Sequence, residues 1–418
     1  MNLETSLIHD GQKPDPAHGA RSVPIYSSSC YHFPDTATAA QRYALQTPGY
    51  IYTRVNNPTN DALEQRLAAL EGAAAALATC SGMAAVFLAF ETLAGAGDHI
   101  VASTSLYGGT NHLLHATLKK FGVATTFVPP RADAIAAAIR PNTKAVYCET
   151  IGNPKCDVPD LAAIAAAAHA AGVPLMVDNT FAPVFCRPVE HGADIIIHST
   201  SKWIGGQGAA IGGAIIDAGR FNWADNPRFP DFNTPDEGCH GLVFATLDAP
   251  FATKARAHGM LNIGLCASPF NSFLFWQSLE TLSVRIARHC ENALALAQWL
   301  KAHPAVEWVN YPGLPEHPDH AVAKRLFNGG FGGVLGFGVK GGRDAAERFI
   351  NRVKLASHMA NVGDVRTLVI HPASTTHSKL DAAQLEACGI TPNFVRVSTG
   401  LEDMCDMCAD FDQALNGL

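Results

Sequence analysis

Residues 193–213 read ADIIIHSTSKWIGGQGAAIGG, a short apolar run that leads through small hydroxyl residues to one lysine and then into glycines. The apolar run is typical of a buried strand. Similar runs alternate with helical patterns on both sides of it, so we expect strands within residues 75–79, 98–103, 124–129, 144–150, 173–180, 193–200 and 212–218. This alternation predicts an α/β fold, a mainly parallel sheet with helices on both faces.

Two helices in this region have recognisable ends. The first is expected to begin at Asn60 or Asp61 and to end at Gly72, and the second lies within residues 159–174 and ends at Gly172. We interpret both as crossover helices between strands.

The two ends of the chain differ from this central region. Residues 1–60 are rich in Pro, Tyr, Asn and Thr and lack a sustained period, which predicts an extended arm. Near residue 260 the pattern changes. One long helical region covers 268–304, and strand-like runs follow it at 306–312, 332–340 and 368–374. We therefore expect an N-terminal arm, an α/β domain and a smaller α+β domain, in the ranges 1–60, 61–265 and 266–418.

Composition excludes several classes of protein. Hydrophobic residues make up 48% of the 418 residues and charged residues only 16%, a low supply of surface charge that favours a homo-oligomer. The formal charge of -7 and the lack of a basic run argue against a nucleic-acid partner. Because the N-terminus lacks signal-peptide features and no apolar run reaches 18 residues, we expect a cytoplasmic protein without a membrane partner.

The cysteines and histidines do not predict a metal site. Eleven cysteines in a long chain without a signal peptide indicate reduced thiols. The one C-x-x-C, Cys405 and Cys408, has no second pair to complete a zinc site and is interpreted as two thiols on a C-terminal helix. The 18 histidines show no convincing helical ligand spacing, so no metal is expected.

Polar side chains follow two of the expected strands where ligands collect in α/β sheets. One run ends in Asp178, and another leads through Ser199 and Ser201 to Lys202. A buried lysine tends to have a lowered pKa and becomes a usable nucleophile. An acid can keep an aromatic nitrogen protonated, and a lysine amine can form a Schiff base with an aldehyde. Together the two groups indicate pyridoxal 5′-phosphate as the cofactor.

A phosphate would need its own binding groups. Ser81, Gly82 and Met83 open a helix directly after a strand, which leaves backbone N–H groups for an anion, and the Ser199 and Ser201 hydroxyls are further donors. The simpler interpretations are a solvated lysine at a strand end and an ordinary strand-to-helix turn. A nucleotide-binding turn fits less well, because GGQG at 205–208 lacks the G-x-G-x-x-G spacing and precedes a strand.

These motifs resemble a known family, the pyridoxal-phosphate enzymes of cysteine and methionine metabolism, in the cystathionine gamma-synthase-like group of fold type I. The resemblance spans nearly the whole chain. It rests on YIYTRVNNPTN, ATCSGMAA, LYGGT, VDNTFAPV, HSTSKWIGGQG, HPASTTHS and VRVSTGLED, in this order. Within the group, the segments at 9–26, 268–293, 303–314 and 358–380 are most similar to O-acetylhomoserine sulfhydrylases.

The resemblance implies roles around the cofactor ring. Lys202 is implied to bind the cofactor aldehyde and then to carry protons between substrate carbons, and Asp178 to pair with the pyridinium nitrogen. Tyr107 is implied to stack on the ring and to be a second proton carrier, and Asn153 to hydrogen-bond the phenolic oxygen. Spacing alone would also fit a locally packed Tyr107 and a turn at Asn153.

The resemblance also implies contacts between subunits and with substrate. Tyr52 and Arg54 are implied to reach from the arm to the phosphate in a neighbouring subunit, with Tyr52 also close to substrate. The active unit is then a dimer with shared sites, expected to pair into a tetramer. Arg396 is implied to bind the substrate α-carboxylate, with Asn361 as a second contact; the alternative for Arg396 is a strand-edge ion pair.

The implied reaction is γ-replacement, in which O-acetyl-L-homoserine and sulfide or a thiol give homocysteine or methionine plus acetate. Methionine γ-lyase is the nearest alternative: Met83 favours it, whereas Gly109, where the lyases usually carry cysteine, does not. The sequence also leaves open an O-succinylhomoserine sulfhydrylase and, more remotely, a non-catalytic nucleotide-binding α/β protein. The identity of the sulfur donor stays open.

Overall fold

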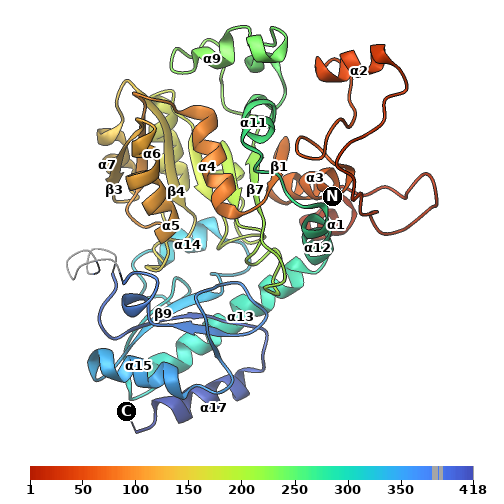
Figure 1. The fold of residues 1–418 in the computed structure, drawn as a ribbon. Helices are drawn as coiled ribbons and strands as arrows, with labels where there is room; N and C mark the ends of the chain where they lie inside the picture. The colour runs from red at the N-terminus through yellow and green to blue at the C-terminus, as the bar shows by residue number, and fades with distance from the viewer. Residues whose placement is uncertain (379–384, 386–388, 418) are drawn as a thin grey trace.

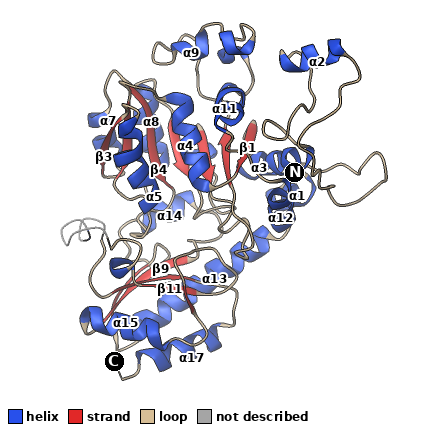
Figure 2. Ribbon diagram, viewed as in Figure 1, coloured by secondary structure: helices blue, strands red, loops and turns tan. Residues whose placement is uncertain are grey.

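The computed structural model describes residues 1–378, 385 and 389–417. These residues form a seven-stranded sheet and a five-stranded sheet, which occupy the upper and lower parts of the molecule in Figures 1 and 2. The large sheet has the order β1-β7-β6-β5-β4-β2-β3. Its strands are Ala75–Thr79 (β1), His99–Ser103 (β2), Ala124–Val128 (β3), Thr143–Glu149 (β4), Leu175–Asp178 (β5), Ile195–His198 (β6) and Gly213–Asp217 (β7).

The expected class of the large sheet is confirmed. Six of the seven predicted runs contain a whole strand of this sheet, and β4 begins one residue before its run; β2 to β6 pair in parallel. β7 alone runs antiparallel to its neighbours, β1 and β6. Since β1 and β6 therefore point the same way, the carboxyl ends of β1, β4, β5 and β6 lie at one edge.

Both faces of the large sheet are covered, as side-chain alternation requires. Ile195 and Ile197 of β6 belong to one apolar cluster, whereas Ile196 belongs to another on the opposite face. Helix α4 lies with the first cluster, and α3 and α8 with the second. The helices of the described residues are Leu3–His9 (α1), Thr36–Tyr43 (α2), Pro58–Glu71 (α3), Gly82–Leu93 (α4), Gly108–His112 (α5), Leu118–Lys120 (α6), Ala132–Ala138 (α7), Leu161–Ala170 (α8), Pro230–Asn233 (α9), Pro250–Ala255 (α10), Leu261–Ile263 (α11), Pro269–Leu279 (α12), Leu282–Ala302 (α13), His320–Leu326 (α14), Gly342–Arg352 (α15) and Met404–Leu415 (α17).

The predictions for the first two helices had different outcomes. Helix α3 begins at Pro58, about one turn earlier than predicted, because the Asn57 side chain accepts a hydrogen bond from the Thr59 N–H and caps the helix. It does end at Gly72, whose φ is +69°. However, α3 precedes β1 and is not a crossover helix, so that interpretation was wrong. Helix α8 does connect the parallel strands β4 and β5.

The arm contains more structure than predicted. It includes α1 and α2, and Figure 1 shows the chain between them, in red, looping away from the large sheet. Helix α1 packs on α3: Leu7 is buried, and the buried Arg66 guanidinium donates to the carbonyls of Ile8 and Asp10. The first turns of the arm thus find partners within their own chain, which the lack of a sequence period did not indicate.

The helical region predicted for 268–304 is two helices. The chain leaves α12 at Leu279 and enters α13 at Leu282, and the Arg285 guanidinium binds the Ser278 carbonyl at 2.8 Å. This side chain replaces the backbone donor that a continuous helix would supply. Helix α12 packs against α3, whereas α13 packs against the small sheet.

The small sheet has the order β10-β11-β12-β9-β8, and its strands are Val306–Asn310 (β8), Val334–Val339 (β9), Ser357–His358 (β10), Leu368–Ile370 (β11) and Phe394–Ser398 (β12). The sequence predicted three of them and missed β10 and the central β12. A smaller α+β unit is confirmed, while the limits drawn at residues 60 and 265 stay predictions.

Two further expectations concern helices and thiols. Among the described residues, no helix combines the length and the apolar character that crossing a bilayer requires. The ten described cysteines are all free thiols, and Cys388 lies outside the described residues. Cys405 and Cys408 lie on α17, as predicted.

Candidate active site

A cavity of about 470 Å³ lies at the edge where β1, β4, β5 and β6 end. All predicted site residues except Tyr52 and Arg54 line it: Ser81, Gly82, Met83, Tyr107, Asn153, Asp178, Ser199, Ser201, Lys202, Asn361 and Arg396. Its volume is within the range of small-molecule sites, about 300–1,000 Å³. The fold therefore brings together residues that are up to 315 positions apart, from Ser81 to Arg396.

The Lys202 amine lies between the two sheets of the molecule. Lys202 follows β6, and its Nζ donates to the side-chain carbonyl of Asn361, which comes from the segment between β10 and β11. Burial lowers the pKa of Lys202, and the positive charge of Arg396 lowers it further. The neutral amine, which is the nucleophilic form, is therefore easier to reach than in an exposed lysine.

Asp178 ends β5 and faces the same cavity. Its Oδ1 accepts the Thr180 N–H at 2.9 Å, and the Tyr147 hydroxyl lies 3.4 Å from its Oδ2. Burial raises the pKa of Asp178, and the hydrogen bonds from Thr180 oppose this rise. Below it, His198 Nε2 lies 2.6 Å from Glu71 Oε1, both fully buried. A positive charge on a group bound in the cavity would favour the ionised form of Asp178 further.

The segment after β1 forms a cradle of backbone groups. Ser81 caps α4, its Oγ accepting the Ala84 N–H at 3.0 Å, and Gly82 and Met83 are the first residues of the helix. A Cβ on Gly82 would lie 2.6 Å from the Cβ of Ser199, so only glycine allows the β6 loop to approach this closely. The N–H groups of a helix's first turn lack intrahelical acceptors and suit an anion.

Ser201 differs from Ser199 in its hydrogen bonds. Its Oγ accepts the Gly212 N–H at 2.9 Å and lies 3.1 Å from the Gly212 carbonyl, to which it donates. A Cβ on the next residue, Gly213, would clash with the Ser81 carbonyl. The glycine-rich segment therefore lets β7 pass close to the cradle, and Ser201 fastens that segment to the Lys202 loop.

A buried arginine closes the opposite side of the cavity. Arg396 lies in β12, where its guanidinium donates to Asn153 Oδ1 at 3.0 Å and to the Asn361 carbonyl at 3.3 Å. Burial lowers its pKa to about 10. No carboxylate of the described residues forms a salt bridge with it, so the alternative of a strand-edge ion pair with Glu402 or Asp403 is wrong.

Tyr107 borders the cavity just before α5, and half of its surface is exposed. Its backbone N–H donates to the carboxylate of Glu149. A Cβ on Gly109 would lie 2.5 Å from the Tyr107 ring, so the absence of a side chain at position 109 sets where this ring can lie.

Tyr52 and Arg54 lie outside the cavity of their own chain. Both belong to the arm, where the Arg54 guanidinium lies 5.3 Å from the centre of the Tyr52 ring and 43% of Tyr52 is exposed. Their assignment to the site stays a prediction that requires a second copy of the chain.

Several residues of the cavity wall were not predicted from the sequence. Glu149 ends β4 beside Asp178, and burial together with the Asp178 charge holds its pKa well above the usual range. It follows an apolar run just as Asp178 does, so the same pattern could have identified it. His377, whose pKa burial lowers to about 4, also lines the cavity; it lies in the motif HPASTTHS, which the sequence analysis used only for the resemblance.

The cavity fits the cofactor expected from the sequence. The lysine amine, the buried acid, the helix N-terminus and the buried arginine are four distinct groups, suited respectively to an aldehyde, a ring nitrogen, a phosphate and a carboxylate. A protonated ring nitrogen beside Asp178 would favour the ionised form of this buried carboxyl, as the nearby His198 charge already does.

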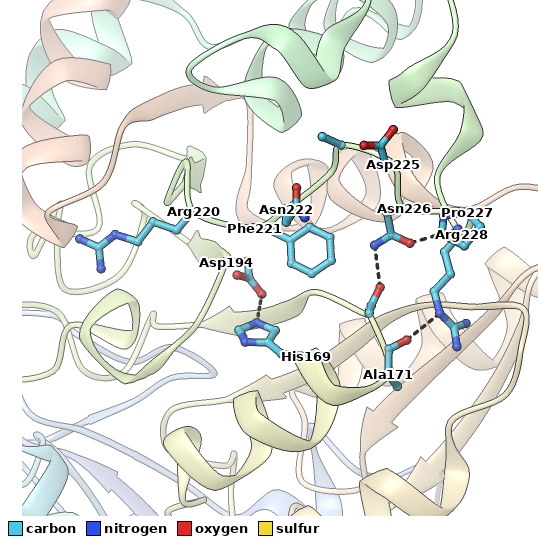
Figure 3. Close-up of a pocket in the computed structure, with 12 residues that line it drawn as sticks. His169, Ala171, Asp194, Arg220, Phe221, Asn222, Asp225, Asn226, Pro227 and Arg228 are labelled. Atoms are coloured by element: carbon cyan, nitrogen blue, oxygen red, sulfur yellow. Dashed lines mark hydrogen bonds and ion pairs between the residues drawn. The ribbon is translucent and has the colours of Figure 1, made fainter.

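A second cavity, of about 630 Å³, lies at the opposite edge of the large sheet (Figure 3). Its lining includes Asp194, which precedes β6, and His169, at the end of α8. The His169 and Asp194 side chains pair at 2.7 Å. The Arg228 guanidinium donates to four backbone carbonyls, those of Arg140, Pro141, Thr143 and Ala171. The His169, Asp194 and Arg228 side chains of this cavity thus already have hydrogen-bond partners within the protein.

Comparison with known proteins agrees with the site. A family of Cys/Met metabolism PLP-dependent enzymes matches residues 4–416. The chain is 50% identical to a homocysteine synthase from Schizosaccharomyces pombe, covering 99% of this chain and 98% of that protein. It is 48% identical to an O-acetyl-L-homoserine sulfhydrylase from Thermus thermophilus, covering 99% and 100%.

A solved structure is also similar over the whole chain. The O-acetylhomoserine (thiol)-lyase structure from Campylobacter jejuni has a TM-score of 0.97 at 39% identity, covers 100% of both chains and carries an N′-pyridoxyl-lysine-5′-monophosphate. Fold, cavity and full-length similarity agree, and we conclude that this chain belongs to the family of Cys/Met metabolism PLP-dependent enzymes.

Proposed function

We propose that the protein catalyses γ-replacement on O-acetyl-L-homoserine, with sulfide or a thiol as the second substrate and homocysteine or methionine plus acetate as products. The observation that carries the proposal is the convergence of Lys202, Asp178 and Arg396 on one cavity. The choice of substrate is supported by full-length relatives at 45–50% identity that include O-acetyl-L-homoserine sulfhydrylases and homocysteine synthases.

The proposed cofactor contacts use five parts of the cavity. Lys202 binds the aldehyde, Asp178 holds a proton on the ring nitrogen and Asn153 binds the phenolic oxygen. Tyr107 covers the ring. The phosphate lies on the first N–H groups of α4, with donors from Ser81, Gly82, Met83, Ser199 and Ser201. Pyridoxal phosphate, when bound, supplies an electron sink beside the amino-bearing carbon of the substrate.

The substrate carboxylate is proposed to bind Arg396. The planar guanidinium can hold both carboxylate oxygens. Its place in the lining of the cavity, beside Asn153 and Asn361, supports this role. Asn361 then offers a second contact. A carboxylate beside Arg396 would also offset the positive charge that now lowers the pKa of Lys202.

Lys202 and Tyr107 are proposed to move the protons of the reaction. γ-Replacement requires that protons leave the α and β carbons and later return, so each carrier must exchange protons near neutral pH. The lowered pKa of Lys202 suits this task, and the hydrogen bond that its amine donates to Asn361 leaves the lone pair of the neutral amine free to accept a proton. Tyr107, which lines the cavity and is half-exposed, is proposed as the second carrier, for the proton transfers near the departing acetate.

Tyr52 and Arg54 are proposed to complete the site of a second copy. Both lie in the arm between α2 and α3, and Arg54 would add a positive charge to the phosphate, with Tyr52 also near substrate. The active unit is then a dimer that shares its sites, and we propose that dimers pair into a cytoplasmic tetramer. Sedimentation of the holoenzyme would test the assembly, and a monomer with full activity would contradict it.

The decisive experiment supplies the purified holoenzyme with O-acetyl-L-homoserine, with and without sulfide, and quantifies homocysteine and 2-oxobutyrate. Sulfide-dependent homocysteine with little 2-oxobutyrate is the expected result. Abundant 2-oxobutyrate in both reactions would indicate a γ-lyase instead, and turnover only with O-succinyl-L-homoserine would correct the leaving group.

A further inference from the structure

A second cluster of reactive side chains lies between β7 and α12, apart from the residues of the Lys202 cavity. Asp236 Oδ2 lies 2.9 Å from His258 Nε2, and Cys239 Sγ lies 3.8 Å from the same nitrogen. One ligand atom from each of the three side chains can be chosen so that all lie within 4.8 Å of one another. No residue of this cluster is used by the proposed reaction.

The backbone holds the first two side chains together. Asp236 precedes a 3-10 turn, Glu237–Cys239, and residues three apart in such a turn lie one above the other. The Asp236 carbonyl accepts the N–H groups of Cys239 and Gly241, and its own N–H binds the Leu242 carbonyl. His240 takes a left-handed conformation, φ +54°, to close this turn.

The third side chain comes from a different element. His258 lies in a one-turn π-helix, Arg256–Met260, inserted between α10 and α11, and such insertions are frequent at functional sites. Its ring packs edge-on against Phe244, with ring centres 5.7 Å apart. The imidazole is therefore oriented from one side by packing and from the other by Asp236.

We propose that Asp236, Cys239 and His258 form a zinc site with water as the fourth ligand. Carboxylate, thiolate and imidazole together are a donor set that suits Zn²⁺ and excludes Mg²⁺ and Ca²⁺, which require oxygen ligands. Tetrahedral zinc at ordinary bond lengths separates sulfur from nitrogen by about 3.5 Å and nitrogen from oxygen by about 3.3 Å. The observed 3.8 and 2.9 Å therefore require only small side-chain movements.

The three side chains of the cluster are partly buried but can still be reached from solvent, as a metal-binding site requires. Cys239 is only 8% exposed, whereas the His258 side chain is 35% exposed and leaves a path for an ion and a water. Asp236 Oδ1 is buried and has no hydrogen-bond partner among the described residues. An oxygen in that position gains a partner when a cation or its water ligand binds.

Binding displaces one proton. A free cysteine thiol has an ordinary pKa of about 8.5 and is mostly protonated at neutral pH. Zn²⁺ forms the Zn–S bond as the S–H bond breaks, and the proton leaves to solvent without any change in oxidation state.

The sequence did not suggest this proposed site, and its expectation of no metal stays a prediction that the titration below tests. Asp236 and Cys239 lie within one turn, but His258 follows 19 residues after Cys239, a spacing outside the usual short motifs. Only the fold places the π-helix beside the 3-10 turn.

Titration of the holoenzyme with Zn²⁺ and Co²⁺, without substrate or added thiol, tests the proposal. We expect one tightly bound ion per chain, and a thiolate-to-cobalt absorption band in the difference between cobalt- and zinc-loaded protein, in which the cofactor absorbance cancels. Cys239→Ala should abolish that band, and both Cys239→Ala and His258→Gln should weaken binding at least tenfold, since even outer-shell changes cost about that much.

Cys405→Ala is the matched control, because it removes an exposed thiol on α17. This variant should bind as the parent does. Zn²⁺ should also raise the unfolding temperature of the parent and of Cys405→Ala but not of Cys239→Ala, which separates metal binding from any loss of folding. Unchanged binding in Cys239→Ala, or a cobalt spectrum without a thiolate band, would overturn the proposal.

Discussion

The two cavities of the large sheet lie at opposite edges and differ in what their polar groups are doing. In the Lys202 cavity the lysine amine and the Arg396 guanidinium bind only asparagine oxygens, which a substrate can replace. In the His169 cavity, the larger of the two, Asp194 is bound by His169 and by the Leu175 N–H, and Arg228 by four carbonyls.

Size therefore does not identify the site. Buried charges are stable only when they are paired or hydrogen-bonded, and the His169 cavity meets this requirement by itself. The Lys202 cavity meets it only in part, with the pKa values of its lysine and its acids displaced by burial. Ionisable side chains that lack a charged partner and have shifted pKa values, at the carboxyl ends of parallel strands, are typical of catalytic sites.

The sharpest test of this contrast removes one side chain from each cavity. Lys202→Ala should reduce turnover at least about 1,000-fold, because it deletes the proposed nucleophile and proton carrier. His169→Ala, the matched variant of the other cavity, should keep the rate within about twofold of the parent. Initial rates of homocysteine formation measure both, and circular dichroism checks the fold. Equal losses of turnover in the two variants would contradict the assignment of catalysis to the Lys202 cavity.

Asp178→Asn should have the next largest effect. The amide keeps the shape of the carboxylate but not its charge, so it cannot hold a proton on the ring nitrogen, and we expect a loss of about 100-fold or more in turnover. Because a costly buried acid is removed, the unfolding temperature should not fall. A variant that was both active and destabilised would make Asp178 a purely structural residue.

Gly109→Ala tests the position of Tyr107. The added Cβ would lie 2.5 Å from the ring, and a half-exposed side chain can move away without unfolding the protein. We expect a fall in turnover of about tenfold, since small displacements of reacting groups are costly, with an unchanged unfolding temperature. Gly108→Ala, whose Cβ would meet only the Thr376 carbonyl at 3.9 Å, is the control. Comparable rates for the two variants would contradict a role for the ring's position.

The smallest effect concerns pH and the His169 cavity. The hydrogen bond to Asp194 raises the pKa of His169, although partial burial opposes this. A raised pKa means that the ion pair stabilises the fold fully below the unfolded value of about 6.5, and that this contribution is lost as the pH rises through the folded value. His169 is 40% exposed, so the contribution should be at most about 1 kcal/mol.

Thermal unfolding of His169→Ala and the parent at pH 6 and pH 9 measures this difference. The variant should be less stable at pH 6 and should match the parent more closely at pH 9. A larger gap at pH 9 would reverse the sign and show that the neutral ring, through packing, is what stabilises this cavity.

The sequence was most informative where one local pattern determined the structure. The seven apolar runs became seven strands because each is short, buried and bounded by turn residues, and Asp178 and Lys202 followed from their places after two of these strands. Glu149 was not predicted although it follows the same rule. It begins the segment ETIGNP, residues 149–154, in which only Asn153 was assigned a role.

Other features depend on contacts between distant segments. The break between α12 and α13 is made by Arg285, whose guanidinium binds carbonyls of Trp203 and Ile204 as well as Ser278. The Arg66 guanidinium binds carbonyls at the end of helix α1. The sequence around Arg66 or Arg285 does not distinguish these buried arginines from exposed ones. Tyr52 and Arg54 depend on a second copy of the chain, so a single chain cannot complete their environment.

The hydrogen bond between Lys202 and Asn361 crosses from the sheet that carries the lysine to the unit built on the smaller sheet, which also contributes Arg396. The proton affinity of the amine is therefore set by groups that do not belong to the sheet holding it. Any shift of one unit against the other changes the distance between two positive charges and so changes how readily the amine gives up its proton. A movement of one unit relative to the other would therefore also change the pKa of Lys202.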